Sequence, residues 1–431
     1  MSSYTACARG TPMPKPSAPK FYAALAHTDN MACFKEGDEG SERQSNIRFL
    51  PERIRDNLLF SLSFDSDIHY ECTEQCGDHR CSDILAEDLP WTKPRRVFAD
   101  CGAFQFRDMS TPQLEDGTLL DHSSAWEMYK KAHLGDRTDN WEEILLCSPD
   151  HIVTEDMTDE EAKTRLEYTI SNAPGFLDAA SEVDRVTPVA VIHGRTVAER
   201  KEQYDEFVSM GFDYVALGGM VPFSGKTGKV LDIVCDTEDQ DDPSVGGDSI
   251  LSRCRRDGVR LHMFGLNSPD WCRWWYRLGM DSFDGSKLST EGAANGWYWL
   301  PKDGKYGREA PEKPVRVSDL YHKLAVKKMG AEEWGWRIEE GVLVPANEVM
   351  VGELNCELNT RCDCPACRYL GRARCTSPRC WKRKSDLENG VESRHCADPR
   401  MMGSTEHNMG RVAHNAHVMD WLLSKIEELM D

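Results

Sequence analysis

The stretch that decides the fold reads RVFADCGAFQ at positions 96–105, where an apolar run ends on an aspartate and a turn sequence follows. Residues 96–99 predict a short strand, and Asp100 would then project from its carboxyl end. In (β/α)8 barrels, the carboxyl ends of the strands carry the catalytic groups. An aspartate before a glycine also forms turns, so this stretch alone leaves a loop-forming role open.

Comparable strand ends recur along the chain. Short apolar runs predict strands at 96–100, 151–154, 188–193, 214–217, 260–264 and 281–283, each followed by Gly, Pro or polar residues. Helix-like segments lie between them, and the one at 196–210 ends at Gly211, as a helix commonly does. This alternation predicts an α/β fold, a TIM-type (β/α)8 barrel with insertions and a C-terminal zinc-binding subdomain.

Changes in composition divide the chain into three parts. Residues 1–20, rich in proline and small residues, predict a flexible N-terminal segment, and 21–350 predict the barrel. Residues 351–431 predict the zinc-binding subdomain and a closing helix. One face of that helix is apolar and comprises Val418, Trp421, Leu422, Ile426 and Leu429.

Charge and cysteine content narrow the function classes. The net charge is −21, with 73 acidic against 52 basic side chains, so contact with a polyanion would need a local basic surface. Such acidity also suits a protein that works in high salt, which points to a halophilic source. No apolar run is long enough to span a bilayer, and the N-terminal residues lack the apolar stretch of a signal peptide. We therefore expect a cytoplasmic protein, whose 17 cysteines serve as metal ligands or free thiols.

A second carboxylate follows a predicted strand near the end of the barrel region. Asp284 lies in the sequence FDG at 283–285, so it would face the same mouth as Asp100. A turn or helix N-cap is the alternative for this aspartate. Polar or glycine residues also follow the apolar runs between the two acids, at 150–156, at His193 and at 218–219. Several strand ends contributing to one site are typical of TIM barrels.

The C-terminal region contains the strongest metal-binding pattern. Cys362, Cys364 and Cys367 give three thiolates at a spacing suited to one tetrahedral zinc ion. Free thiols are the alternative. The spacing leaves the fourth ligand open among four histidines, His395, His407, His414 and His417.

Taken in order, these motifs resemble the tRNA-guanine transglycosylase superfamily, most closely its branch that inserts 7-deazaguanines into DNA. The resemblance covers roughly 99–431. The family pattern Asp-Ser-Gly-Gly-(Phe/Tyr)-Gln corresponds to DCGAFQ at 100–105, and the stretch with the family's nucleophile corresponds to DSFD at 281–284. The family's zinc-binding histidine lies in a context matched by TEHN at 405–408, which selects His407 as the fourth ligand. Four protein ligands make this zinc structural.

The resemblance implies a role for each matching residue. Asp284 would attack C1′ of the target nucleotide and form a covalent intermediate, while Asp100 would act as general acid and base. The chain would thus be a pentosyltransferase that acts on a flipped or unpaired nucleotide. Residues that match base-binding positions of the family are Phe104, Gln105, Asp156, His193, Gly218, Gly219 and Phe264. Of these, His193 stands where bacterial members have a glutamine, and core packing is the alternative for each phenylalanine.

Two departures from the family bear on the polymer. After Asp284 the chain lacks the Leu-Pro-Thr-Arg stretch that bacterial tRNA enzymes use, and it ends about one helix after His407. Both departures favour DNA as the substrate polymer. By analogy, they also favour a virus that masks its genome as the source of the protein. The insertion between Cys367 and His407 is basic, and we expect contacts to nucleic-acid phosphates from Arg368, Arg372, Arg374, Lys382 and Arg383. Three further cysteines there leave a second metal site open; they are Cys375, Cys380 and Cys396.

Two other functions stay open at this point. A compact tRNA-guanine transglycosylase would use the same chemistry on tRNA, and a non-catalytic zinc-bearing barrel would only bind nucleic acid. The expected partners are DNA, or alternatively tRNA, and a 7-deazapurine such as preQ0, with no membrane contact. If the source is a virus, the location would be the host cytoplasm. A homodimer also remains open, as does the identity of the deazapurine.

Overall fold

The computed structural model describes a barrel region almost completely and the C-terminal region only in part. The described residues are 18–24, 50–62, 95–114, 116–134, 142–237, 245–289, 297–301, 321–325, 336–339, 342–345 and 405–430. For the four strands between 297 and 345, and at a few helix ends, only the backbone is described.

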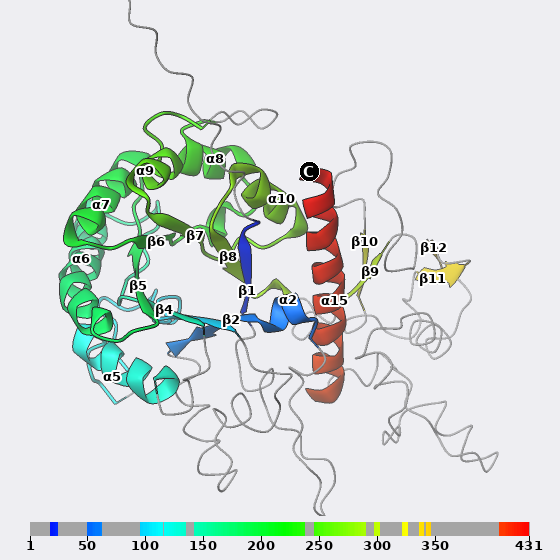
Figure 1. Cartoon of the computed structure of the whole chain (residues 1–431), viewed down its shortest axis with the longest axis horizontal. Helices are drawn as coiled ribbons and strands as arrows, with labels where there is room; N and C mark the ends of the chain where they lie inside the picture. Colours follow the sequence, from blue (N-terminus) through cyan, green and yellow to red (C-terminus); the bar gives the residue numbers. More distant parts are fainter. Residues whose placement is uncertain are drawn as a thin grey trace, which may run out of the picture.

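Eight parallel strands close into a barrel in chain order, with the last strand paired to the first (Figure 1). The strands are β1 (Lys20–Ala24), β2 (Asn57–Ser61), β3 (Arg96–Asp100), β4 (Glu143–Cys147), β5 (Val186–Ile192), β6 (Tyr214–Leu217), β7 (Arg260–Met263) and β8 (Ser282–Gly285). Their runs of Val, Ile, Leu and Phe are buried on both faces, as expected of a parallel sheet covered by helices. The predicted TIM-type barrel is confirmed.

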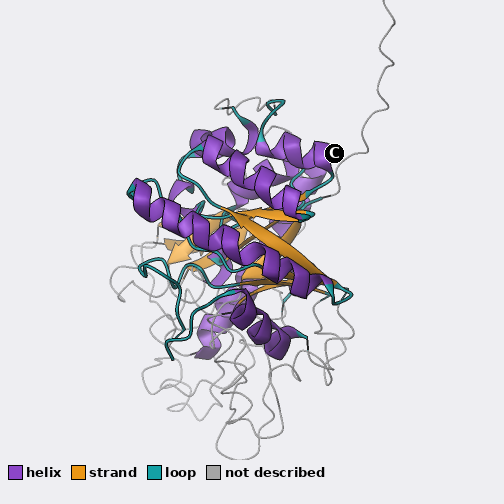
Figure 2. Ribbon diagram, turned by 90° about the vertical axis from the view of Figure 1, so that its left-hand side faces the viewer, coloured by secondary structure: helices purple, strands orange, loops and turns teal. Residues whose placement is uncertain are grey.

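Helices connect the strands and wrap around the outside of the barrel (Figure 2). They are α2 (Glu52–Arg55), α5 (His122–His133), α6 (Asp159–Ser181), α7 (Val197–Met210), the 3-10 helix η2 (Val221–Phe223), α8 (Thr227–Cys235), α9 (Ile250–Asp257), α10 (Pro269–Leu278), α11 (Lys287–Ser289) and α15 (Thr405–Met430). The predicted helix at 196–210 corresponds to α7. Thr196 and Glu199 form a capping box at its start, and Gly211 ends it with a φ of 111° that a glycine adopts without strain.

The last helix, α15, lies beside α10 and α2 and takes the place of the eighth barrel helix (Figure 1). Val418, Leu422 and Ile426 of its predicted apolar face are fully buried. Arg53 of α2 donates two hydrogen bonds to the Glu427 carboxylate, at 2.8 and 2.9 Å. The helix therefore packs on the barrel, although we grouped it with the zinc-binding subdomain. Residues 346–404 lie outside the described part of the chain, so that subdomain remains a prediction.

Two short antiparallel sheets follow the barrel in the sequence. They pair β9 (Trp297–Pro301) with β10 (Tyr321–Ala325), and β11 (Trp336–Glu339) with β12 (Val342–Pro345). In Figure 1 they lie beyond α15, on the side away from the barrel. The barrel strands themselves thus end at Gly285.

One predicted strand is wrong. Residues 151–154 form no strand, and the fourth strand of the barrel is Glu143–Cys147 instead. Ile144 to Cys147 are completely buried and pair with both β3 and β5. Pro149 follows closely and has no N–H to donate to a neighbouring strand, so the ladder ends before it. This shift by eight residues changes which acidic side chain lies at the end of the strand.

Alternate residues of each strand face the barrel interior. A buried cluster in the interior contains Tyr22, Phe98, Val191 and Tyr214, with Phe264 packed against it. Because side chains in a strand alternate with a period of two, Asp100 lies on the same side as Phe98. The inward-facing side chains at the carboxyl ends of the strands therefore include polar groups such as Asp100.

Candidate active site

The two predicted catalytic carboxylates lie at the carboxyl ends of their strands. Asp100 is the last residue of β3, and Asp284 lies in β8 next to its final residue, Gly285. The strands are parallel, so both ends open on the same mouth of the barrel. The charge of Asp284 is one cause of the raised pKa of Asp100, which means that the two carboxylates interact.

Asp100 is held as a carboxyl group that can exchange a proton near neutral pH. Its Oδ1 accepts a hydrogen bond from the Gly102 N–H at 2.7 Å. Burial raises the pKa of Asp100 to about 7, although hydrogen bonds from Ser61 and Gly102 oppose the rise, and the charges of Asp284 and Asp150 add to it. A group with such a pKa can both donate and accept a proton in one catalytic cycle.

Asp284 presents its two oxygens differently. The side chain is buried, and Oδ1 accepts a hydrogen bond from the Gly265 N–H at 2.8 Å. The same oxygen lies 3.3 Å from Nε2 of His262. Among the residues that the structure describes, Oδ2 has no hydrogen-bond partner. One oxygen is therefore held in place while the other remains available for reaction.

A third carboxylate, Asp150, lies in the same mouth, and the sequence analysis did not single it out. Its Oδ2 lies 2.6 Å from Nε2 of His193, and its Oδ1 accepts a hydrogen bond from the Cys101 thiol at 2.9 Å. Asp150 is 4% exposed and His193 is 1% exposed. A buried carboxylate is costly unless it has partners, and His193 and Cys101 are the partners of Asp150.

Asp156, the predicted base-binding aspartate, lies elsewhere. It is exposed in the loop that leads to α6, and a hydrogen bond from Thr154 lowers the pKa of its carboxyl group. The structure gives it no contact with Asp100, Asp284 or His193. The cause is the misplaced fourth strand: once that strand is Glu143–Cys147, Asp150 is the acid that follows it. The buried run EILLC, ended by Pro149, was the signal that could have identified it.

The glycines at 218–219 pack tightly against His193. A Cβ on Gly218 would lie 2.4 Å from Cε1 of His193, so no larger residue fits there. Gly219 has a φ of 67°, and a Cβ on it would lie 3.5 Å from Nδ1 of His193. That nitrogen is buried and has no hydrogen-bond partner within the described part of the chain. Behind this backbone, the buried guanidinium of Arg200 donates to the Gly218 carbonyl at 3.0 Å.

The predicted aromatic contacts lie at the rim and in the wall of the mouth. Phe104 is 57% exposed, with the Arg107 guanidinium 4.2 Å from its ring centroid. Phe264 is half-buried and packs edge-on against Phe98, with 5.5 Å between ring centroids. Gln105 is half-buried, and its N–H donates to the Gly102 carbonyl within the turn after β3. Among the described residues, Phe104 and Phe264 form no ring contact with each other.

Nothing in the described part of the chain tests the predicted zinc and phosphate contacts. The three cysteines lie outside the described residues, as does the basic segment; these are Cys362, Cys364, Cys367, Arg368, Arg372, Arg374, Lys382 and Arg383. His407 lies in the first turn of α15, where only the backbone is described. His414, another histidine of this helix, is completely buried. The five described cysteines are free and buried, and they are Cys101, Cys147, Cys235, Cys254 and Cys272.

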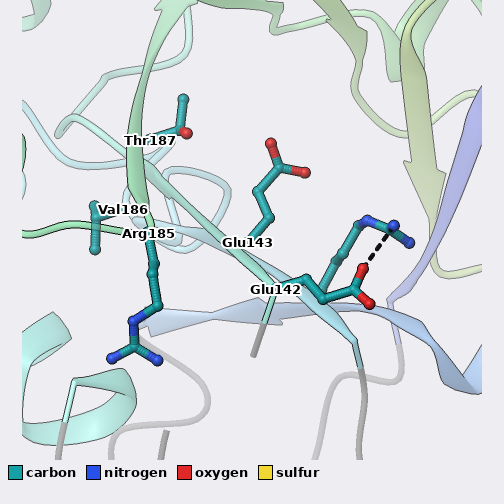
Figure 3. A pocket seen from close by; sticks show the side chains of 6 residues that line it. Glu142, Glu143, Arg185, Val186 and Thr187 are labelled. Carbon is teal, nitrogen blue, oxygen red and sulfur yellow. Dashed lines mark hydrogen bonds and ion pairs between the residues drawn. The ribbon is translucent and has the colours of Figure 1, made fainter. Parts of the chain in front are cut away.

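A polar cavity of about 360 Å³ opens at the opposite, amino-terminal end of the barrel (Figure 3). Its lining includes Arg96, Glu142 and Glu143. Glu142 accepts a hydrogen bond from Arg96 at 2.8 Å, and Glu143 accepts one from Lys20 at 3.1 Å and another from Arg260. Both carboxylates at this end of the barrel thus have lysine or arginine partners.

Comparison with known proteins gives one significant similarity. No protein-family model matches the chain. A DNA-guanine transglycosylase from Salmonella montevideo is 24% identical over 198 residues, which are 44% of this chain and 40% of that protein. The match thus spans less than half the length of that relative. It supports the resemblance to the guanine transglycosylase superfamily. In the described part of the chain, no helix is both long and apolar enough to cross a membrane.

Proposed function

We propose that this chain is a guanine transglycosylase that exchanges a guanine in DNA for a 7-deazapurine such as preQ0. The observation that carries the proposal is the presence of Asp100 and Asp284 at the carboxyl ends of β3 and β8 in one mouth, where the charge of Asp284 contributes to the raised pKa of Asp100. Among the described residues, neither forms an ion pair with a lysine or an arginine. The name of the Salmonella montevideo relative favours DNA as the polymer.

The proposed reaction is a double displacement. The free Oδ2 of Asp284 forms a bond to C1′ of the nucleotide, while the bond from C1′ to the guanine nitrogen breaks and the guanine keeps the electron pair. Protonated Asp100 gives its proton to the departing base. The deazapurine then loses a proton to Asp100 and attacks C1′, and the bond to Asp284 breaks. The pKa of Asp100, about 7, suits a group that must give and then take a proton.

Asp150 is our candidate for the residue that reads the incoming base, in place of Asp156. The pyrimidine edge of a guanine-like base carries two N–H donors, and a buried carboxylate is a suitable acceptor for them. The unpartnered Nδ1 of His193 and the adjacent backbone of Gly219 offer further polar contacts. Exposed Phe104 and half-buried Phe264 supply aromatic surface at the same end of the barrel. A base inside a duplex could not reach these groups, so the target nucleotide must be flipped or unpaired.

A structural zinc ion belongs to the proposal. Cys362, Cys364, Cys367 and His407 form a donor set of three thiolates and one imidazole, which suits tetrahedral zinc. Because His407 lies in the first turn of α15, zinc would tie the segment before this helix to the barrel. His407→Ala should lower the zinc content measured by atomic absorption, while His414→Ala should retain it. The opposite result would reassign the ligand, and two zinc ions per chain would indicate a second site at Cys375, Cys380 and Cys396.

The polymer is tested by mass spectrometry of nucleosides. DNA and a tRNA transcript are each incubated with the protein and preQ0 at the same salt concentration, then digested and analysed. We expect the deazapurine nucleoside in DNA. Its appearance in tRNA alone would contradict the DNA assignment and retain the transglycosylase chemistry. Its absence from both, together with nucleic-acid binding, would favour a non-catalytic barrel.

The basic segment offers a second test of the polymer. Changing Arg372, Arg374, Lys382 and Arg383 to Ser should weaken DNA binding and flatten its dependence on salt, by about one unit of slope for each lost phosphate contact. Exchange on a saturating short substrate should survive. An unchanged salt slope would place the DNA contacts elsewhere.

A further inference from the structure

A chain of buried hydrogen bonds crosses the barrel and ends at the proposed nucleophile. The Tyr214 hydroxyl on β6 lies 2.5 Å from Oγ of Ser282 on β8, and this Oγ lies 2.6 Å from Nδ1 of His262 on β7. Nε2 of His262 lies 3.3 Å from Oδ1 of Asp284. Tyr214 is 2% exposed, and Ser282 and His262 are completely buried. Three strands thus place one connected polar path beneath the mouth.

When Asp284 is a carboxylate, each hydrogen bond of the polar path donates in the direction of Asp284. Oδ1 can only accept, so Nε2 of His262 carries a hydrogen. Burial lowers the pKa of His262, despite the hydrogen bond and charge of Asp284, so the ring is neutral and Nδ1 is an acceptor. Ser282 therefore donates to Nδ1 and accepts from the Tyr214 hydroxyl. Burial raises the pKa of Tyr214, which keeps this hydroxyl protonated.

Packing alone does not account for His262. Its ring lies 4.3 Å from the Phe98 centroid and 4.6 Å from the Phe264 centroid, in surroundings where a leucine or methionine would pack without polar demands. A buried imidazole is favourable only when its nitrogens find partners. Both nitrogens of His262 do, and one of those partners is the proposed nucleophile.

We infer that His262 is a positioning residue for Asp284, fixing Oδ1 together with the Gly265 N–H so that Oδ2 is the oxygen that attacks C1′. The inference rests on the proposed function, because it assumes that Asp284 forms the covalent intermediate. Ser282 and Tyr214 contribute indirectly, since they keep the hydrogen of His262 on Nε2. None of these three residues touches the substrate in this account.

The same two donors also serve the second displacement. When the deazapurine attacks C1′, the bond from C1′ to Oδ2 breaks and its electron pair returns to the Asp284 carboxylate. The charge is then shared with Oδ1, where the N–H groups of His262 and Gly265 already point. Loss of the His262 donor should therefore slow both formation and resolution of the adduct, and it should leave binding of the deazapurine nearly unchanged.

A matched pair of variants separates positioning from packing. The amide of His262→Gln reaches the place of Nε2 and retains a donor to Asp284, whereas that of His262→Asn reaches only the place of Nδ1. We expect kcat of exchange to fall about 10- to 100-fold in His262→Asn, as for loss of a hydrogen bond to a charged group, with KM for preQ0 little changed. His262→Gln should stay within about 3-fold of wild type.

Two further variants keep the test decisive if His262→Asn does not fold. Ser282→Ala removes the donor to Nδ1 of His262. It should slow adduct formation more than Tyr214→Phe, because Tyr214 is one hydrogen bond further from Asp284. Single-turnover formation of the DNA adduct and thermal melting are measured for all four variants. Rates that fall in step with melting temperature, or equal rates for the Asn and Gln variants, would overturn the positioning role. If the wild type forms no adduct, the proposed function fails and this inference fails with it.

Discussion

Partly buried carboxylates have opposite surroundings at the two ends of the barrel. At the amino-terminal end, Glu143 of β4, which Figure 3 shows in the cavity lining, forms ion pairs with Lys20 and Arg260. Burial alone would raise the pKa of Glu143, but the hydrogen bonds and charges of these two cations hold it below its ordinary value. At the carboxyl-terminal end, no described lysine or arginine forms an ion pair with Asp100, Asp150 or Asp284, and burial raises the pKa of Asp100 to about 7.

This difference teaches which acids hold the fold together and which can react. An acid paired with cations is stabilised as a permanent anion, and its role is to join strands. An acid that lacks a cation among its described neighbours is costly for stability, and proteins retain such groups mainly at functional sites.

Asp284→Asn should produce the largest loss. An amide cannot replace the carboxylate as nucleophile, so we expect exchange to fall by about 1,000-fold or more, to the background rate. Release of labelled guanine from DNA measures the rate. The melting temperature should not fall, because the change removes a buried charge. Exchange within about 10-fold of the wild-type rate would remove Asp284 from the role.

Asp150→Asn and Asp156→Asn form a pair that tests which acid reads the base. Asp150 is buried in the mouth, so its loss should lower kcat/KM for the deazapurine about 100-fold or more, because two donors of the base would lose their acceptor. Asp156 is exposed, and its variant should stay within about 2-fold of wild type. Steady-state kinetics at varied deazapurine concentrations measure kcat/KM for both variants. The reverse ranking would restore Asp156 to the predicted role.

Glu143→Gln should affect stability and leave exchange intact. The change leaves Lys20 and Arg260 without their anion, which we expect to cost about 1–3 kcal/mol in the free energy of unfolding. Glu142→Gln is the matched control, since Glu142 is more exposed and its pairs with Arg95 and Arg96 should contribute about 1 kcal/mol or less. Denaturant unfolding measures both. A clear loss of exchange in Glu143→Gln at saturating substrate would break the contrast between the two ends.

Asp100→Asn should collapse exchange, because Asp100 is the proposed general acid and base, but its effect on stability should be a small gain that depends on pH. The folded-state pKa of Asp100 is about 7, above its unfolded value, so the folded protein binds the proton more tightly. Its contribution to stability is therefore present at pH 4 and is lost as the pH rises to 7. Asp100→Asn does not lose this contribution. Its free energy of unfolding should therefore exceed that of wild type by about 1–2 kcal/mol at pH 8 and by less at pH 5. Equal free energies of unfolding for Asp100→Asn and wild type at both pH values would contradict the raised pKa of Asp100.

The barrel, and the position of Asp100 and Asp284 at strand ends, could be predicted from the sequence because both are local features. An apolar run that ends on an aspartate and a glycine indicates a strand end at Asp100 and at Asp284, and parallel closure then brings them together. The wrong fourth strand arose because 151–154 contains β-branched residues that resemble a strand. The true strand, Glu143–Cys147, contains one β-branched residue, and the packed barrel buries it completely from Ile144 to Cys147.

The path from Tyr214 to Asp284 could not be predicted from local pattern. Its four side chains come from three strands, and their contacts exist only when the barrel closes. The period of two does place Ser282 and Asp284 on one side of β8, and likewise His262 and Phe264 on β7. It does not give the register between strands, which decides whether His262 meets the nucleophile.

The most direct test of the account is to locate the covalent intermediate. DNA containing guanine is mixed with the wild-type protein, quenched with denaturant during turnover, digested with nuclease and protease, and mapped by mass spectrometry. The account predicts a sugar attached to the peptide that contains Asp284, and no adduct in Asp284→Asn. A sugar attached to Asp100 or Asp150, or exchange that proceeds without any adduct, would contradict it.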